Sequence, residues 1–174
     1  LTKVEYGSPR WQVSAAMAKK GAPTTSTNGY DSYFHTDDSN DTEGDLTAYG
    51  LRAYWKPETT GAIPAVQVGY DFGTYDEAVS TDAKDISGWM IGLGWKDVLI
   101  DGNSAGFAYG SRMAATAYEG TGNDPTEDNN VWEAYYTFRV NDGVSITPAV
   151  FGGSDVESDG KDVSGAVLLT EFRF

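Results

Sequence analysis

The sequence contains no cysteine, one histidine and no apolar run of the roughly 18 residues that a transmembrane helix needs. The lack of cysteine excludes disulfide bonds and thiolate metal sites. Basic residues are also scarce, because 12 Lys and Arg stand against 26 Asp and Glu, for a net charge of -14. That balance argues against a nucleic-acid partner, since phosphates need a basic surface. The chain also starts without Met or a signal peptide, so we expect Leu1 to begin a processed or truncated chain.

Aromatic residues and glycine are abundant. Aromatic side chains make up 13% of the chain and there are 21 Gly, yet the mean hydropathy is only -0.42. A membrane β-barrel has this composition, because its strands are apolar only at alternate positions and the whole sequence therefore scores as hydrophilic.

Alternation of apolar and polar residues predicts eight strands of about ten residues, the length that a tilted strand needs to cross a bilayer. The last of them reads VSGAVLLTEFRF and ends the chain on an aromatic residue. Residues 1–6 are expected to be the tail of a further strand. The strands are expected near residues 11–20, 46–56, 65–75, 86–96, 105–118, 131–140, 144–151 and 163–174.

One face of each predicted strand carries large apolar side chains, and the other carries glycine and polar residues. In 86–96, for example, Trp89 and Leu93 alternate with Gly92 and Gly94. In 105–118, we expect Phe107, Met113 and Ala115 on the apolar face and Arg112 on the opposite one.

The connections alternate in length and charge. Four long acidic connections fall at one end of the predicted strands, and shorter turns, including the hairpin signal Asn141-Asp142-Gly143, fall at the other. An outer-membrane barrel has long external loops and short periplasmic turns. We therefore expect an antiparallel transmembrane barrel, with aromatic girdles at both rims. The girdle candidates are Trp55, Trp95, Phe138 and Phe174 at one rim and Tyr75, Tyr118 and Trp132 at the other.

Three segments resemble cyanobacterial outer-membrane porins, which are grouped with OprB-like carbohydrate-selective porins and in part labelled iron-uptake porins. They are VWEAYYTFRVNDGVSITPAVF (131–151), LRAYWKP (51–57) and LLTEFRF (168–174). The resemblance implies a barrel of roughly sixteen strands. Residues 1–174 would then be its C-terminal half, with an N-terminal barrel portion absent from this sequence.

Charged residues on the polar faces are the candidates for lining a pore. They are Arg52, Asp71, Arg112, Glu133 and Arg139. Rings of charge tune ion selectivity in pores, and we expect the arginines to favour anions or neutral solutes. The alternative reading, that each is simply a solvated residue of the lumen, stays open.

Neither an enzyme nor a cofactor is expected. His35 lies beside Asp37 and Asp38, a pair of residue types that can serve as a general base, but no further catalytic group accompanies them. The acidic stretch DDSNDTEGD lacks the glycine of a calcium-binding EF-hand loop, so we expect neither a metal site nor catalytic residues.

The predicted function is an outer-membrane porin, a water-filled channel for passive diffusion of ions and small hydrophilic solutes. Its expected partners are outer-membrane lipid, the diffusing solutes and further copies of itself, with a trimer as one option. The alternative is a complete eight-stranded barrel with a structural or adhesive role, because eight strands close around a filled interior. Glycine-rich inner faces count against it, since glycine cannot fill a small lumen. A soluble lipocalin-like barrel is a third reading.

Overall fold

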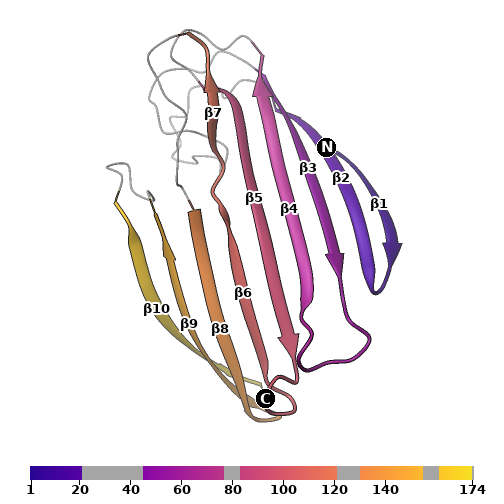
Figure 1. Ribbon diagram of the computed structural model, residues 1–174, viewed down its shortest axis with the longest axis vertical. Helices are drawn as coiled ribbons and strands as arrows, with labels where there is room; N and C mark the ends of the chain where they lie inside the picture. Colours follow the sequence, from indigo (N-terminus) through magenta and orange to yellow (C-terminus); the bar gives the residue numbers. More distant parts are fainter. Residues whose placement is uncertain (21–44, 77–82, 121–129, 155–160, 174) are drawn as a thin grey trace.

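The computed structural model describes residues 1–20, 45–76, 83–120, 130–154 and 161–173. These residues form one all-β, antiparallel sheet of ten strands (Figure 1), and they contain no helix that could cross a membrane. The strands are β1 (Thr2–Ser8), β2 (Trp11–Lys20), β3 (Leu46–Trp55), β4 (Ala65–Tyr75), β5 (Ala83–Lys96), β6 (Ser104–Ser111), β7 (Ala114–Tyr118), β8 (Asn130–Asn141), β9 (Val144–Gly153) and β10 (Val163–Phe172).

The alternation pattern located the strands well, with two exceptions. The first is β1, which pairs with β2 from Thr2 to Ser8 and so runs two residues beyond the predicted range 1–6. The second is the predicted strand 105–118, which the structure divides into β6 and β7. The expectation of eight strands was therefore too low.

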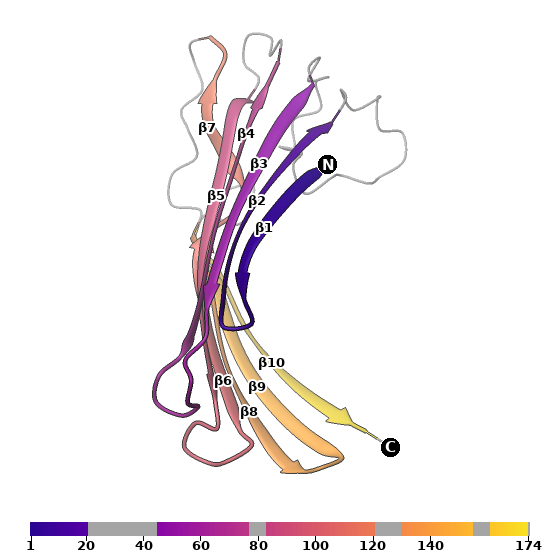
Figure 2. The same cartoon turned by 90° about the vertical axis from the view of Figure 1, so that its right-hand side faces the viewer.

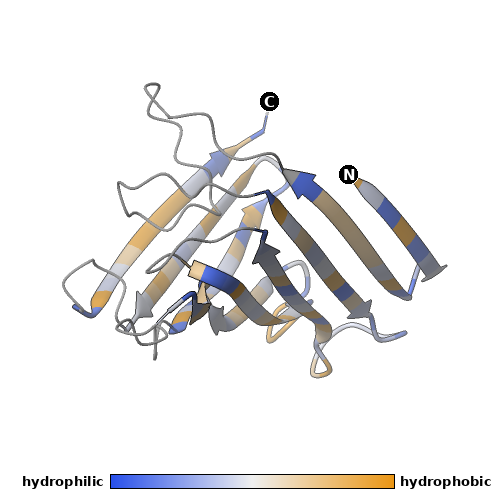
Figure 3. Cartoon of the chain, turned by 90° about the horizontal axis from the view of Figure 1, so that it is seen from above, coloured by the Kyte–Doolittle hydropathy of each residue, from blue (hydrophilic) through white to orange (hydrophobic). Residues whose placement is uncertain are grey.

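The strands follow chain order across the sheet from β1 to β10, with β7 beside β5 and off this path. The sheet bends into an open trough (Figures 2 and 3). Its two edges are β1 and β10, and within the described residues β1 pairs only with β2 and β10 only with β9. The part of the sheet that the structure describes is therefore not closed on itself.

The register gives the sheet two different faces. One row of laterally paired residues crosses β2 to β8 and consists of Val13, Ala53, Val68, Ile91, Tyr109 and Trp132. The adjacent row lies on the other side of the sheet and consists of Gln12, Tyr54, Gln67, Gly92, Ala108 and Glu133. We call these sides the apolar face and the polar face.

The apolar face is exposed. Leu51, Val68, Tyr70 and Trp89 each keep more than 40% of their surface accessible, although they lie in the middle of the sheet. Their aromatic neighbours pack against one another across the strands, as in the stacked pair Tyr49–Phe72, with ring centroids 5.1 Å apart. A continuous apolar surface of this kind marks a contact with lipid or with another protein.

The buried core of the described residues is small and lies at the end of the sheet from which the acidic connections leave. It consists of Leu46, Tyr75, Ala83, Ile86 and Ala115, and we call it the apolar cluster. Because Leu46 pairs with Tyr75 and Ile86 with Ala115, in register with Ala48 and Gly73, the cluster belongs to the polar face. Tyr75 belongs to this cluster and Tyr118 packs against it, so their predicted place in a girdle on the apolar face was wrong.

The register of the sheet changes by one residue between β6 and β7. Met90 of β5 faces Gly110, whereas Ser87, three residues back, faces Ala114, four residues further on. One extra residue in a strand moves all later side chains to the opposite face. Ala115 accordingly belongs to the apolar cluster on the polar face, and Met113 packs against that cluster. The prediction that both residues share a face with Phe107 was therefore wrong.

At the opposite end of the sheet, a buried asparagine holds the β5–β6 turn against β8. Asn103 is 4% exposed. Its side-chain oxygen accepts a hydrogen bond from Arg139 N at 2.9 Å, and its amide donates to the Tyr136 hydroxyl at 3.1 Å. Tyr136 in turn donates to the carbonyl of Val98 at 2.9 Å. These bonds satisfy the polar groups that the turn would otherwise leave unpaired.

Candidate functional site

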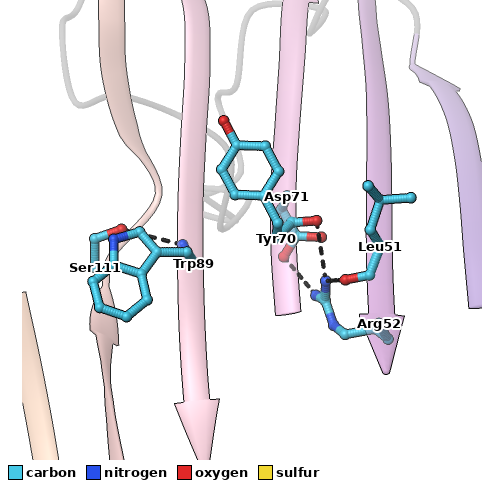
Figure 4. A network of polar contacts seen from close by, with 6 residues as sticks. All are labelled: Leu51, Arg52, Tyr70, Asp71, Trp89 and Ser111. Atoms are coloured by element: carbon cyan, nitrogen blue, oxygen red, sulfur yellow. Dashed lines mark hydrogen bonds and ion pairs between the residues drawn. The ribbon is translucent and has the colours of Figure 1, made fainter. Parts of the chain in front are cut away.

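An ion pair between β3 and β4 occupies the middle of the polar face. Arg52 Nη2 lies 2.5 Å from Asp71 Oδ2 (Figure 4). In the register, Arg52 faces Gly69 and Asp71 faces Gly50, so the pair is diagonal and each charged residue has a glycine opposite it. A Cβ on Gly69 would lie 3.0 Å from Arg52 Cδ, and one on Gly50 would lie 2.8 Å from Asp71 Oδ1. The two glycines therefore provide the space in which the charged side chains meet.

Additional backbone contacts hold the guanidinium in place. Arg52 Nη1 donates to the carbonyl of Leu51 at 2.9 Å and to that of Tyr70 at 3.4 Å. The side chains of Arg52 and Asp71 are 47% and 33% exposed, so solvent screens their attraction and the pair stabilises the fold by only about 0.2–1 kcal/mol. Its main consequence is electrostatic, because the positive charge of Arg52 is neutralised locally.

Arg112 lies close to this pair along the sheet. Gly88 of β5 is the cross-strand neighbour of Asp71. A Cβ on Gly88 would lie 3.2 Å from both the Cα and the N of Met113, and 3.3 Å from the carbonyl carbon of Arg112. The main chain at Arg112–Met113 therefore lies over the polar face of Gly88, one strand away from Asp71.

Two further contacts define this break in the strand. Trp89 N donates to the Ser111 hydroxyl at 3.1 Å, so a side chain accepts the bond at this point (Figure 4). At Gly110, an added Cβ would lie 2.2 Å from the Trp89 carbonyl oxygen, which leaves room for glycine alone. Together with the added residue, these contacts form a β-bulge, a feature that re-aims side chains and often lies beside functional sites.

A groove lies beside these residues on the polar face. Residues from five strands line it, and they include Tyr54, Gln67, Glu133 and Tyr135, together with Lys56 just after β3. Its floor at Gly94 is open, because a Cβ there would meet nothing within 4 Å. Glu133 faces Ala108 and Phe151 in the register, and no ion-pair partner of its carboxylate lies within the described residues.

Arg139 lies apart from the other predicted site residues. It is near the end of β8, where its Nη2 contacts Asp142 Oδ1 at 2.6 Å in the β8–β9 turn. Arg173 similarly pairs with Glu171 at 2.9 Å. The structure therefore brings Arg52 and Asp71 together on adjacent strands, with the Arg112 main chain one strand further along, places Glu133 across the groove, and puts Arg139 at the rim.

Sequence reasoning missed the glycines that make room for these groups, although a signal was present. Gly50-Leu51-Arg52 and Gly69-Tyr70-Asp71 share the spacing glycine, any residue, charged residue. When two such segments pair antiparallel around Leu51 and Tyr70, each glycine necessarily faces the other strand's charge.

No group of three or more His, Cys, Asp or Glu residues comes together among the described residues in a way that could hold a metal ion. His35 and its acidic neighbours lie outside the described residues. The polar face combines a salt bridge, an open position at Gly94 and the Glu133 carboxylate, and this arrangement can guide water and solutes along a surface. No family model, curated protein or solved structure matches the chain.

Proposed function

We propose that this sheet is part of the wall of an outer-membrane β-barrel porin, a water-filled channel through which ions and small hydrophilic solutes diffuse. The observation that carries the proposal is the inverted arrangement of the two faces. The large side chains of the apolar face are exposed, whereas the described apolar residues that are buried form one small cluster on the polar face.

A bilayer explains that inversion. In hydrocarbon, backbone polar groups must be satisfied within the protein, and a laterally hydrogen-bonded sheet does so for every strand except those at its edges. Lipid would cover the apolar face, while the polar face would line water. Charged residues at mid-sheet support this assignment, since Arg52 and Asp71 both lie on the polar face.

The polar face favours a channel over a filled barrel. A filled interior needs large side chains to occupy it, but Gly92, Gly94, Gly106 and Gly110 lie on this face and Gly94 has open space above it. The groove lined by Tyr54, Glu133 and Tyr135 would then be exposed to permeating solutes. The complete eight-stranded barrel is less well supported, because the edges of the sheet remain apart.

Closing the wall requires strands in addition to those seen. Nine strands follow one another across the sheet in alternating directions, so β1 and β10 run the same way. An antiparallel barrel can close onto both edges only through an odd number of further strands. We propose that they come from an N-terminal barrel portion, as the porin resemblance implies, and that sixteen strands in all would meet the requirement.

The ends of the strands suggest an orientation. The sequence segments between β2 and β3, β4 and β5, β7 and β8, and β9 and β10 each contain several Asp or Glu and leave the sheet from the same end. In the proposed membrane this end faces the outside of the cell, and the short turns face the periplasm. Outer-membrane lipid is then the main partner. Further copies of the protein are proposed as additional partners, for example in a trimer within the membrane.

Planar-bilayer recording of the protein in the full form its gene encodes tests the proposal. A channel should give stepwise current increases of uniform size in KCl, and the current should rise in proportion to the salt concentration as in a water-filled pore. A purified, folded protein that inserts into the bilayer without producing steps would refute it. A heat-unfolded sample of the same preparation is the control.

A further inference from the structure

We propose that the β-bulge at Arg112–Met113 is the element of this wall that narrows the channel and so sets its size limit for solutes. The inference rests on the proposed function and adds a location and a residue to it. It uses the break in the strand order at residues 111–113, where main chain, and not only a side chain, comes close to a glycine of the polar face.

The geometry of Gly88 places the bulge. In a regular ladder Gly88 would have its lateral neighbour beside it, in the plane of the sheet. Instead, the N and Cα of Met113 lie 3.2 Å from the position of a Cβ on Gly88. Gly88 pairs with Asp71 of the polar face, so this Cβ direction points to the side proposed to line water. The bulge therefore projects into the lumen, and Arg112, an exposed residue, is carried on it.

The bulge is anchored on both sides. Met113 contacts the apolar cluster, in which Ile86 and Ala115 are at most 2% exposed. On the other side, Gly110 lies against the Trp89 carbonyl and the Ser111 hydroxyl accepts the Trp89 amide. An element fixed at both ends keeps its position while solutes pass, which is what a size limit requires.

Its neighbours extend the narrow zone along the polar face. The Arg52–Asp71 pair lies on the two strands beyond Gly88, in the same part of the sheet. The ion pair on β3 and β4 and the bulge between β6 and β7, separated by β5, thus form neighbouring obstacles, whereas the groove at Gly94 remains open.

Two changes test the role of the bulge in the full protein. The substitution Arg112→Ala shortens the side chain that the bulge carries. Deleting Arg112 removes the additional residue, and since Gly110 faces Met90 and Ala114 faces Ser87, a shorter chain can run regularly between these pairs without altering either face. Arg10→Ala, which shortens an exposed arginine in the β1–β2 turn, outside the predicted site residues, is the matched control.

The readouts are single-channel conductance in 1 M KCl, where the Debye length is only about 3 Å, and the largest uncharged polyethylene glycol that lowers it by entering the pore. We expect both to increase for Arg112→Ala, to increase more for the deletion, and to stay at the wild-type value for Arg10→Ala. If the deletion variant does not fold, the result for Arg112→Ala decides the question. If the wild type conducts, and the folded Arg112 variants have the same conductance and the same polyethylene glycol limit as the wild type, the inference about the bulge is wrong while the proposed function stands. If the wild type forms no channels, the proposed function is wrong as well.

Discussion

Arg52 and Asp71 meet diagonally across β3 and β4, with Nη2 and Oδ2 2.5 Å apart and each side chain lying over the glycine opposite it. The sequence alone predicts that the arginines of the polar face, Arg52 among them, favour anions or neutral solutes. The pairing changes this view, because the two charges largely cancel at a distance longer than their separation. In the proposed channel, charge selectivity at this point would then depend on the balance of the pair.

Breaking the pair from either side should therefore shift selectivity in opposite directions. Asp71→Asn leaves Arg52 uncompensated and should raise the anion-to-cation permeability ratio, while Arg52→Gln leaves Asp71 uncompensated and should lower it. The double substitution should return the ratio close to the wild-type value. Reversal potentials under a KCl gradient measure this ratio. Equal shifts in the same direction from both single substitutions would contradict the pairing.

Two glycines of the polar face should respond oppositely to the same substitution. A Cβ at Gly110 would lie 2.2 Å from a backbone oxygen, so Gly110→Ala forces the main chain to move and should destabilise the protein by about 2 kcal/mol or more, the upper part of the usual range. Gly94→Ala meets nothing within 4 Å and should be neutral or stabilise by about 0.4–1 kcal/mol, since it restricts the unfolded chain.

Equilibrium unfolding in detergent micelles compares the two variants with the wild type. Equal destabilisation by Gly94→Ala and Gly110→Ala would show that the close approach of Gly110 to Trp89 is not a property of the folded protein.

The Asn103 side chain should be the most sensitive polar group of the turns. Asn103→Ala removes both its bonds and leaves the amide of Arg139 without its acceptor. We expect a loss of about 1–3 kcal/mol, the usual cost of a buried unsatisfied group. Tyr136→Phe, which removes one hydroxyl that bonds to Asn103 and Val98, should cost less. Urea unfolding of the two variants checks the order, and a larger loss for Tyr136→Phe would contradict it.

Asp97 in the same turn should make stability depend on pH. A hydrogen bond from Gly102 N, at 2.8 Å, and a second from the Thr60 hydroxyl hold the pKa of the Asp97 carboxyl below its ordinary value. A lowered pKa in the folded state means that the carboxylate stabilises the turn above its unfolded pKa, and that this stabilisation is lost as the pH falls through the folded pKa.

Asp97→Asn keeps a residue type that tolerates the positive φ of 54° at this position. The wild type should be more stable than this variant at neutral pH, and the difference should disappear in acid. Thr60→Val removes one donor and should move the pH at which this occurs upward. A wild-type advantage that stays constant down to the acid limit would exclude the role of the Asp97 carboxylate.

The sequence was informative wherever a residue's face follows from its position in a regular strand. Period-two alternation placed Arg52, Asp71 and Glu133 on one side and Tyr70, Trp89 and Phe138 on the other, and the register agrees. Alternation carries this information because each strand is extended and every step reverses the side chain.

The change between β6 and β7 could not be predicted in the same way. Phe107, Tyr109, Met113 and Ala115 alternate without interruption in the sequence, and only the contacts of the break with β5 show that Met113 turns to the other face. The change of face depends on two contacts with β5, that of Gly110 with Trp89 and that of the Arg112–Met113 backbone with Gly88. The residues whose face changes, such as Met113, lie outside β5. Pattern within one strand does not contain that information.

Labelling of single cysteines tests most directly whether the apolar face meets lipid and the polar face meets water. Because residues 1–174 contain no native cysteine, each introduced thiol is the only one in this part of the wall. Leu93 and Ala134 lie on the apolar face, and Gly94 and Tyr135 lie next to them on the polar face.

Each of the four positions is replaced by Cys, and the protein in intact outer membranes is treated with a small charged thiol reagent that lipid excludes. We predict fast reaction at Gly94→Cys and Tyr135→Cys and protection at Leu93→Cys and Ala134→Cys, with all four reacting after denaturation. Fast reaction at positions 93 and 134, with protection at 94 and 135, would contradict the account.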